Sequence, residues 1–329
     1  MSALLEVEAL SVHLRQDGRE AAILDRVGFS LQAGSALGIV GESGCGKSVL
    51  ALSLIGLLPP AMRASGAIRL DGIDLLTLTE PALCRVRGRR VSMVFQEPTR
   101  ALNPTQPIGR QVAEGMRLHL RLGRAEAEAR AGRLLDRVGL PGAVVSPHSL
   151  PHRLSGGQRQ RVMIAVALAC DPSLLIADEL STALDMTTQA QILELLAELV
   201  AERRMGLLLI THDLGLLAQV CSHALVLYAG HTVETATIPA LLAARAHPYT
   251  EGLFASGLHV GTVTPGSVLP TIPGQVPPPF SRGDGCCFAS RCPRMQPDCL
   301  PAQPPLVVIG DTASAEPHRV ACLHPLIAA

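Results

Sequence analysis

The sequence predicts an α/β fold in which a parallel core sheet carries a phosphate-binding loop. Residues 174–177 and 207–210 are short, continuous apolar runs, typical of strands that are buried on both faces of a sheet. A third apolar run, residues 37–40, leads into a glycine-rich loop at residues 41–48, and a helix-like segment follows over residues 48–58. A strand, a glycine-rich loop and a helix in this order form the usual setting of a phosphate site.

The glycine-rich loop has the pattern G-x-x-x-x-G-K-S. Its glycines let successive backbone N–H groups curl around phosphate oxygens, and the N-terminus of the following helix adds positive potential. The chain has 28 basic residues, of which 27 are arginines and one, Lys47, is a lysine. A compact ammonium group fits a phosphate-binding loop where a planar guanidinium does not. We therefore expect phosphate binding by Gly41, Glu42, Ser43, Gly44, Cys45, Gly46, Lys47 and Ser48, with the Ser48 hydroxyl on Mg²⁺.

The N-terminal segment, residues 3–40, alternates apolar and polar positions around turn signals at Gly18 and Gly34. This pattern predicts antiparallel strands that end in the strand before the loop. A nucleotide base would pack near residues 12–14. Since Leu14 is aliphatic, we expect apolar contact there without an aromatic face.

A further strand, residues 91–95, delivers Gln96 at its C-terminal end. A side-chain amide both donates and accepts hydrogen bonds, which suits a residue that contacts Mg²⁺ or an attacking water and later releases it. A polar residue that merely ends a strand is the alternative.

A second glycine-containing motif follows a helical region. Residues 108–138 are rich in Ala, Leu, Arg and Glu, and prolines after residue 140 end this pattern. The next helix extends to Cys170 and is opened by Leu154, Ser155, Gly156, Gly157 and Gln158. A serine N-cap followed by two glycines exposes several N–H donors, which predicts a second anion-binding helix end without a lysine. An ordinary capped helix is the alternative.

Acidic residues and a histidine follow two of the buried strands. Asp178 and Glu179 end the run at 174–177, at the edge where open α/β sheets bind ligands. Asp178 suits Mg²⁺ and Glu179 suits an attacking water. His212 follows the run at 207–210 and could bind a γ-phosphate, although a structural histidine is the more common case. We expect the last strand at residues 224–228.

In this order, the motifs resemble those of an ATP-binding cassette (ABC) ATPase. The resemblance covers about residues 3–245 and rests on the phosphate loop, Gln96, residues 154–158, Asp178, Glu179, residues 183–185 and His212. It implies a P-loop NTPase core of the ABC, RecA-like type with an antiparallel β subdomain. It also implies an ATPase domain at residues 1–250 with a helical subdomain at about residues 97–165.

The resemblance also implies a mechanism in which water attacks the γ-phosphate of MgATP. Ser48, Gln96 and Asp178 would hold Mg²⁺, Glu179 would orient the water, and His212 would steady the γ-phosphate. Gln96 would couple the site to membrane subunits.

Pairing of two such domains is a further implication. In a head-to-tail pair, Ser155 and Gly157 of one subunit close over ATP held by Lys47 of the other, so hydrolysis needs a dimer. The chain departs from the family at Leu14, at residues 99–100, and at residues 180–181, where Leu-Ser replaces Pro-Thr. We expect hydrolysis to be retained because each charged catalytic position is present. A non-hydrolysing regulatory subunit is the alternative to which residues 180–181 point.

Cys45 has two interpretations. Its place beside Lys47 at a helix N-terminus would lower a thiol pKa and raise reactivity. We favour the simpler interpretation that the side chain fills a small space in the loop.

Charge and hydrophobicity give no sign of nucleic-acid binding, of a signal peptide or of a membrane span. Basic and acidic residues balance at 28 each, so no overall field favours nucleic acid. We also expect no signal peptide, because Met1 is not followed by a basic and then an apolar region, and no apolar run long enough for a membrane span.

The last segment, residues 251–329, is rich in Pro and Gly and holds a cluster of cysteines. Five of the nine cysteines lie between Cys286 and Cys322. The expected ligand set is Cys286, Cys292, Cys299 and Cys322. Four thiolates suit zinc or an iron–sulfur cluster, and free thiols or disulfides are the alternatives.

This tail resembles the C-terminal region of the ATPase subunits of oligopeptide, dipeptide and nickel importers, in which four cysteines can carry a [4Fe–4S] cluster. The resemblance implies an ATPase coupled to solute import (a translocase), at the cytoplasmic face of the bacterial inner membrane. Its partners would be a second, related ATPase subunit, two membrane permeases and an extracytoplasmic solute-binding protein. A soluble ABC ATPase of translation or DNA repair is the competing class, but those chains usually have two cassettes or long coiled-coil insertions.

Overall fold

A computed structural model of the chain describes residues 3–180, 186–256, 270–310 and 317–327. The chain forms two compact units, and both are discontinuous in sequence. The first unit consists of Met1–Leu5, Leu31–Ala36 and Thr77–Leu209, and the second of Glu6–Ser30, Leu37–Leu76 and Ile210–Ala329. Within the described ranges, no helix is long and apolar enough to cross a bilayer.

The N-terminal part of the second unit is a four-stranded sheet in the order β2-β1-β4-β5. Its strands are β1 (Leu5–Gln16), β2 (Arg19–Leu31), β4 (Met62–Leu70) and β5 (Ile73–Asp74). A two-residue turn joins β1 to β2, and Gly18 in this turn has a φ of 74°, in the left-handed region that glycine adopts without strain. The expectation of antiparallel strands around Gly18 is confirmed.

The other strands of the second unit run in the order β11-β12-β10-β9-β3. They are β3 (Ala36–Val40), β9 (His223–Tyr228), β10 (His231–Thr237), β11 (Val307–Val308) and β12 (Arg319–Val320). β3 pairs in parallel with β9, and β9 pairs antiparallel with β10. The expectation that residues 224–228 form the last strand is therefore wrong. The turn at Gly230 leads directly into β10, whose threonines and Val233 favour an extended chain.

Helices α1 (Lys47–Leu54), α8 (Leu214–Val220), α9 (Ile238–Ala243) and α10 (Pro248–Ser256) also belong to the second unit. α1 ends four residues earlier than residues 48–58 predict. Gly56 takes a left-handed φ of 64°, and two prolines follow at 59–60, so the helix cannot continue.

The first unit contains strands in the order β8-β7-β6. These are β6 (Val91–Val94), β7 (Leu174–Asp178) and β8 (Gly206–Thr211), whose last two residues belong to the second unit. β6 and β7 are parallel, and all five residues of β7 are buried. The continuous apolar run at 174–177 thus forms the doubly covered strand that it predicts.

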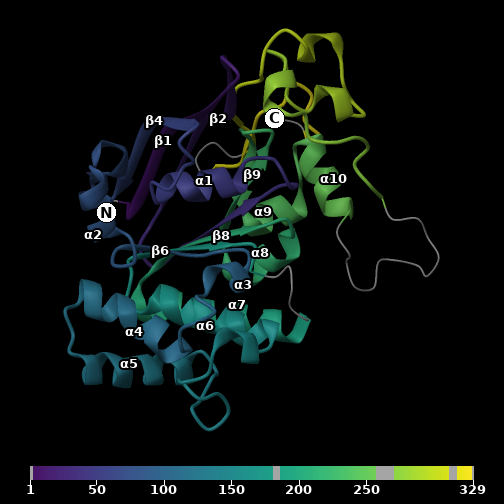
Figure 1. Cartoon of the computed structure of the whole chain (residues 1–329). Helices are drawn as coiled ribbons and strands as arrows, with labels where there is room; N and C mark the ends of the chain where they lie inside the picture. Colours follow the sequence, from purple (N-terminus) through teal and green to yellow (C-terminus); the bar gives the residue numbers. More distant parts are fainter. Residues whose placement is uncertain (1–2, 181–185, 257–269, 311–316, 328–329) are drawn as a thin grey trace. The chain divides into compact units, whose positions relative to one another are not determined.

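The helices that the structure describes in the first unit are drawn in blue and teal in Figure 1. They are α2 (Glu80–Val86), α3 (Pro98–Ala101), α4 (Ile108–His119), α5 (Arg124–Arg137), α6 (Gly156–Leu168) and α7 (Met186–Arg203). The helical pattern at 108–138 is two helices, because Arg121 has a φ of 57° and breaks it. α4, α5 and α6 pack on one another, in the region where we expect the helical subdomain.

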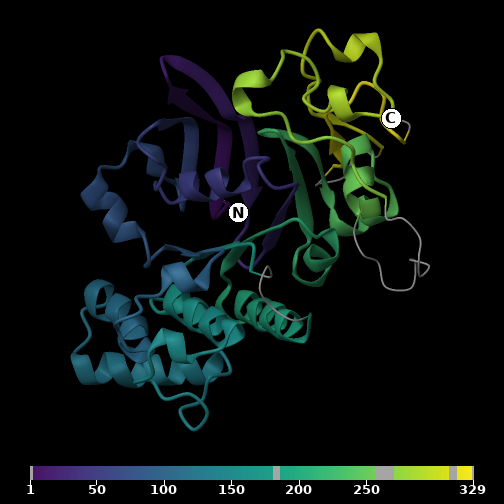
Figure 2. The ribbon, with the colours of Figure 1, turned by 45° about the vertical axis from the view of Figure 1, so that its right-hand side comes forward.

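The C-terminal extension is mostly loops and short 3₁₀ turns, shown in yellow in Figure 2. β12 adds an antiparallel strand to β10, with Glu234 opposite Val320. Glu234 is fully buried and accepts hydrogen bonds from the N–H groups of Ala246 and His247 at 2.7 and 2.9 Å. Its carboxylate also lies 2.7 Å from Nε2 of His318. The extension is thus part of the second unit, and the domain boundary at 250–251 stays a prediction.

Candidate functional site

The phosphate loop joins β3 to α1 in the strand–loop–helix order that the sequence predicts. Lys47 is buried, and its Nζ donates hydrogen bonds to the carbonyl oxygens of Gly41 at 2.7 Å and Glu42 at 3.0 Å. Gly46 precedes α1 with a φ of 113°, and a Cβ there would lie 2.7 Å from the Leu24 side chain, so only glycine fits. Among the described residues, no side chain caps this helix end. The loop therefore presents backbone donors and an ammonium group at one place.

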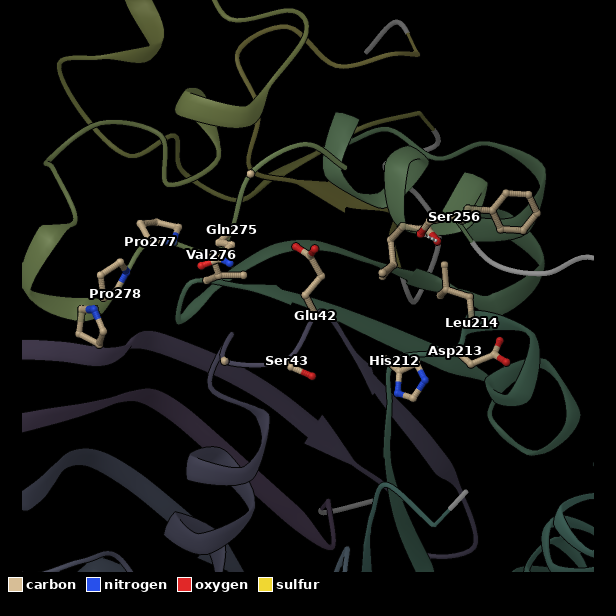
Figure 3. A pocket seen from close by; sticks show the side chains of 15 residues that line it. Glu42, Ser43, His212, Asp213, Leu214, Ser256, Gln275, Val276, Pro277 and Pro278 are labelled. Atoms are coloured by element: carbon tan, nitrogen blue, oxygen red, sulfur yellow. Dashed lines mark hydrogen bonds between the residues drawn. The ribbon is translucent and has the colours of Figure 1, made fainter. Parts of the chain in front are cut away.

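A cavity of about 910 Å³ lies in front of this loop, inside the second unit. Figure 3 shows Glu42 and Ser43 of the loop facing it together with His212. The opposite wall comes from the extension, at Gln275 and Val276. The structure therefore brings His212 and the phosphate loop to one cavity, as the sequence predicts, with a volume in the range of ligand pockets.

Only part of the segment where we expect a base to pack, residues 12–14, is accessible. Val12 has 0 % of its surface exposed, so it belongs to the core, whereas Leu14 is half-buried in β1. A base could reach Leu14 but not Val12.

The acidic residues lie in the first unit with Gln96. The Gln96 side-chain amide donates to Oε2 of Glu179 at 2.7 Å, which leaves its own carbonyl oxygen as an acceptor. Asp178 and Glu179 are both buried. Glu179 has a φ of 46°, and a non-glycine residue held in this left-handed region costs on the order of 1 kcal/mol, a strain that clusters at functional sites.

The motif at 154–158 forms a complete capping box at the start of α6. The Ser155 hydroxyl accepts from the N–H of Gln158 at 3.3 Å, and the Gln158 side chain accepts from the N–H of Ser155 at 2.9 Å. The expected N-cap is confirmed, and Ser155 and Gly156 are exposed. Residues 181–185, which include the predicted segment 183–185, lie outside the described residues.

Cys45 is completely buried inside the phosphate loop. Burial raises the pKa of its thiol, although the neighbouring Lys47 opposes this shift. Since the thiolate is the reactive form, the structure supports the space-filling interpretation. Gly41 is part of the same close packing, because a Cβ there would lie 2.7 Å from Cys45 Sγ.

Four of the five cysteines of the extension line one small cavity. All nine cysteines lie in described segments, and each is a free thiol. The cavity is lined by all four predicted ligands, Cys286, Cys292, Cys299 and Cys322. A hydrogen bond from the neighbouring Cys287 lowers the pKa of Cys286 to about 4, and burial raises the pKa of Cys322 to about 11.

Sequence reasoning missed two contacts of the phosphate loop, one with α10 and one with the extension. The Tyr249 hydroxyl accepts from the N–H of Glu42 at 2.7 Å, and Arg291 pairs with the Glu42 carboxylate at 2.6 and 3.0 Å. This bonding to Glu42 raises the pKa of Arg291. No local sequence pattern predicts these contacts, because the partners lie more than 200 positions apart in sequence.

Nearly the whole chain is similar to known proteins. Residues 24–182 match the family model described as ABC transporter, and residues 233–299 match the one described as oligopeptide/dipeptide transporter, C-terminal region. A Brucella abortus (strain 2308) protein named for peptide import and ATP binding is 49 % identical over 318 residues, which cover 96 % of this chain and 95 % of that protein. The oligopeptide transport ATP-binding protein AppD of Bacillus subtilis (strain 168) is 44 % identical over 311 residues, 93 % of this chain and 94 % of AppD.

A solved structure shares the fold. It is the dimeric, post-hydrolysis state of the ATP-binding cassette MJ0796 bound to ADP and Pi, with a TM-score of 0.65 and 26 % identity. The alignment covers 71 % of this chain and 98 % of that one. The expected α/β ABC ATPase fold, with an antiparallel β subdomain, is confirmed. The chain belongs to the ABC transporter ATP-binding proteins of the oligopeptide/dipeptide family.

Proposed function

We propose that this chain binds and hydrolyses MgATP to energise the import of peptides across the bacterial inner membrane. ATP-driven transport is the activity of the family to which the chain belongs. The observation that carries the proposal is the buried Lys47 in a loop beside an open cavity, in the same unit as a transporter-type C-terminal region.

The phosphates are the first part of the proposed site. The loop N–H groups and Lys47 would bind and neutralise them, as the uncapped start of α1 supports. When bound, Mg²⁺ would neutralise charge that develops on the phosphates. Ser48, Gln96 and Asp178 offer oxygen atoms, which are the ligands that Mg²⁺ prefers.

Hydrolysis is the second part. Glu179 would accept a hydrogen bond from the attacking water and orient it, and Gln96 is already bonded to this carboxylate. His212 would donate to the γ-phosphate from its side of the cavity. Such chemistry depends on positioning and charge rather than on a covalent intermediate.

A second subunit would complete the site. Ser155 and Gly157 of one chain would face the ATP held by Lys47 of the other, and the exposure of Ser155 supports this. The dimeric state of MJ0796 supports pairing as well. We propose a related but different cassette as the partner, with two permeases and an extracytoplasmic solute-binding protein, so that the chain works at the cytoplasmic face of the inner membrane.

Peptides are the proposed solute class. The relatives described above are named for peptide import or oligopeptide transport, and the family model of the tail names oligopeptides and dipeptides. None of these names supports nickel, the other solute that the sequence suggested.

A metal centre on the four tail cysteines is a finer proposal. Tetrahedral zinc at about 2.3 Å from each sulfur would hold thiolates roughly 3.8 Å apart. Within the described chain, no three of these thiols lie within 4.8 Å of one another; the group that does is Asp298, Cys299 and His324. In a [4Fe–4S] cluster each thiolate binds a different iron, so wider spacing fits. Anaerobic purification tests this, and a colourless protein without iron would contradict it.

Transport is the decisive test of the function. The chain would be assembled in liposomes with the proposed second cassette and two permeases, and the solute-binding protein would be added with the peptide. We expect MgATP to drive uptake of labelled di- or oligopeptides, and a non-hydrolysable ATP analogue not to do so. Uptake of Ni²⁺ but not of peptides would overturn the solute assignment, and absence of ATP hydrolysis would favour a regulatory subunit.

A further inference from the structure

Glu42, the second residue of the phosphate loop, is held from the C-terminal extension. Arg291 donates through Nη1 to Oε2 of Glu42 at 2.6 Å and through Nη2 to Oε1 at 3.0 Å. Two parallel bonds between a guanidinium and a carboxylate form the strongest common ion-pair geometry in proteins. The Arg291 side chain is only 4 % exposed and that of Glu42 28 %, so solvent screens this pair much less than a surface pair.

The guanidinium of Arg291 is itself fixed on the extension side. Its Nε donates to the carbonyl oxygen of Pro273 at 2.7 Å, and Nη2 also reaches that of Ile272 at 3.2 Å. Its Cζ lies 5.7 Å from the ring centroid of Tyr228. If Arg291 moved away from Glu42, it would also break its hydrogen bonds to these two carbonyl groups.

A second contact holds the backbone of the same loop residue. The N–H of Glu42 donates to the Tyr249 hydroxyl at 2.7 Å. Tyr249 is fully buried, and its ring packs on Tyr228 and Phe288 with centroids 4.5 and 5.4 Å apart. Because an aromatic cluster fixes the tyrosine, Glu42 is held through both its side chain and its main chain.

One further hydrogen bond links Glu42 to Lys47, so that holding Glu42 also positions the lysine. The carbonyl oxygen of Glu42 accepts a hydrogen bond from Lys47 Nζ at 3.0 Å. We propose that Arg291 is a positioning residue for nucleotide phosphates, which acts through Glu42 to keep the phosphate loop and Lys47 in their binding arrangement before ATP arrives. This inference rests on the proposed binding of ATP. Its physical basis is preorganisation, which removes part of the ordering cost of binding.

The test is the affinity of the purified full-length chain for MgATP, measured by titration calorimetry. We expect Arg291→Gln to weaken binding about tenfold, which equals about 1.4 kcal/mol. Arg291→Lys should weaken it by a smaller factor, since a lysine keeps the charge but lacks the fork. The matched control is Arg282→Gln, because Arg282 also joins the extension to the body of the unit, at the carbonyl oxygen of Ala22 (2.8 Å). Affinity within twofold of the wild type is expected for this control.

A double-mutant cycle separates positioning from a general loss of structure. We expect Glu42→Gln to weaken MgATP binding about as much as Arg291→Gln, and the double variant to be no weaker than either, because both changes remove one interaction. Thermal unfolding without nucleotide would confirm that each variant is folded, and Glu42→Gln keeps the test valid if Arg291→Gln does not fold.

If the wild type binds MgATP, the proposed function stands, and three results would then overturn the inference about Arg291. These are unchanged affinity in Arg291→Gln, an equal loss in Arg282→Gln, and additive losses in the double variant. If the wild type itself did not bind MgATP, the proposed function would fail instead.

Discussion

Two helix N-termini in this chain carry glycine-rich motifs, and they satisfy their backbone donors in opposite ways. In the described structure α1 begins after Gly46 without a side-chain cap, with the buried Lys47 as its first residue. α6 begins after Ser155 with a complete capping box, so the helix already satisfies part of its own N–H groups. The start of α1 thus leaves its N–H groups available to an anion, whereas the start of α6 is capped without one, with Ser155 and Gly156 exposed. This difference supports the proposal that the first motif binds the phosphates and that the second completes the site of a partner subunit.

The largest expected effect separates hydrolysis from binding. Replacing the base in Glu179→Gln should lower ATP turnover by on the order of 10³-fold, since a positioned general base contributes about 10²–10⁴-fold. MgATP should remain bound and become trapped, because the phosphate loop is unchanged. Steady-state ATPase and retained nucleotide would be measured in the assembled complex. Glu198→Gln, a change at an exposed carboxylate that pairs with Arg137, is the control; unchanged turnover in Glu179→Gln would contradict the assignment.

Substitution of Lys47 tests whether the phosphate loop binds MgATP. Lys47→Ala should weaken MgATP binding by on the order of 100-fold, because it removes a buried ammonium from the phosphate site. Lys47→Arg should not restore affinity, since a planar guanidinium needs more space. Ser155→Ala should bind MgATP as the wild type does. An equal loss in that variant would break the comparison between the two motifs.

Two substitutions at Ser155 test whether the start of α6 is stabilised by its cap and whether it faces a phosphate of the partner subunit. Ser155→Ala should lower the free energy of unfolding by about 1 kcal/mol through loss of the cap. Ser155→Asp should keep the cap and the stability, yet it should reduce ATPase of the assembled complex at least roughly tenfold, because a carboxylate would repel the partner's γ-phosphate. Chemical denaturation and ATPase assays measure the two effects. Normal ATPase in Ser155→Asp would show that the motif does not face a phosphate.

The smallest expected effect concerns thiol accessibility. Cys45 should resist alkylation at neutral pH with or without ATP, because its side chain is 0 % exposed and burial raises its pKa. In the variant Ser155→Cys, the new thiol at the exposed helix start should react readily. Peptide mass mapping after timed labelling would compare the two sites. Rapid labelling of Cys45 in the nucleotide-free chain would show that the phosphate loop is open rather than packed.

Local patterns predicted most of the core and both motifs. The phosphate loop, the Ser155 cap and the buried strand β7 each depend on neighbouring residues, so composition and spacing suffice to find them. Gln96 was expected at a strand end, and the structure adds that it bonds to Glu179. The end of α1 was misplaced because Gly56 stops the helix before the apolar residues run out.

Contacts between distant segments could not be predicted in the same way. β10 pairs with β12, which lies more than 80 positions later in the sequence. The residues next to Glu234 in sequence therefore do not predict its hydrogen bonds to residues 246, 247 and 318. The pair between Glu42 and Arg291 spans 249 positions, and Arg291 is one of 27 arginines. The four cysteines that the sequence grouped do line one cavity, and a metal centre there stays a proposal.

Because Lys47 is the single lysine of the chain, cleavage by a lysine-specific protease can measure how often the phosphate loop opens. A protease that cuts only after lysine has one possible side chain to recognise, and that side chain is 4 % exposed with its ammonium bonded inside the loop. Cleavage therefore requires the loop to open, and its rate follows the population of the opened form when closing is fast. The two fragments seen on a gel would measure every opening that exposes Lys47, whether the loop opens locally or the whole chain unfolds.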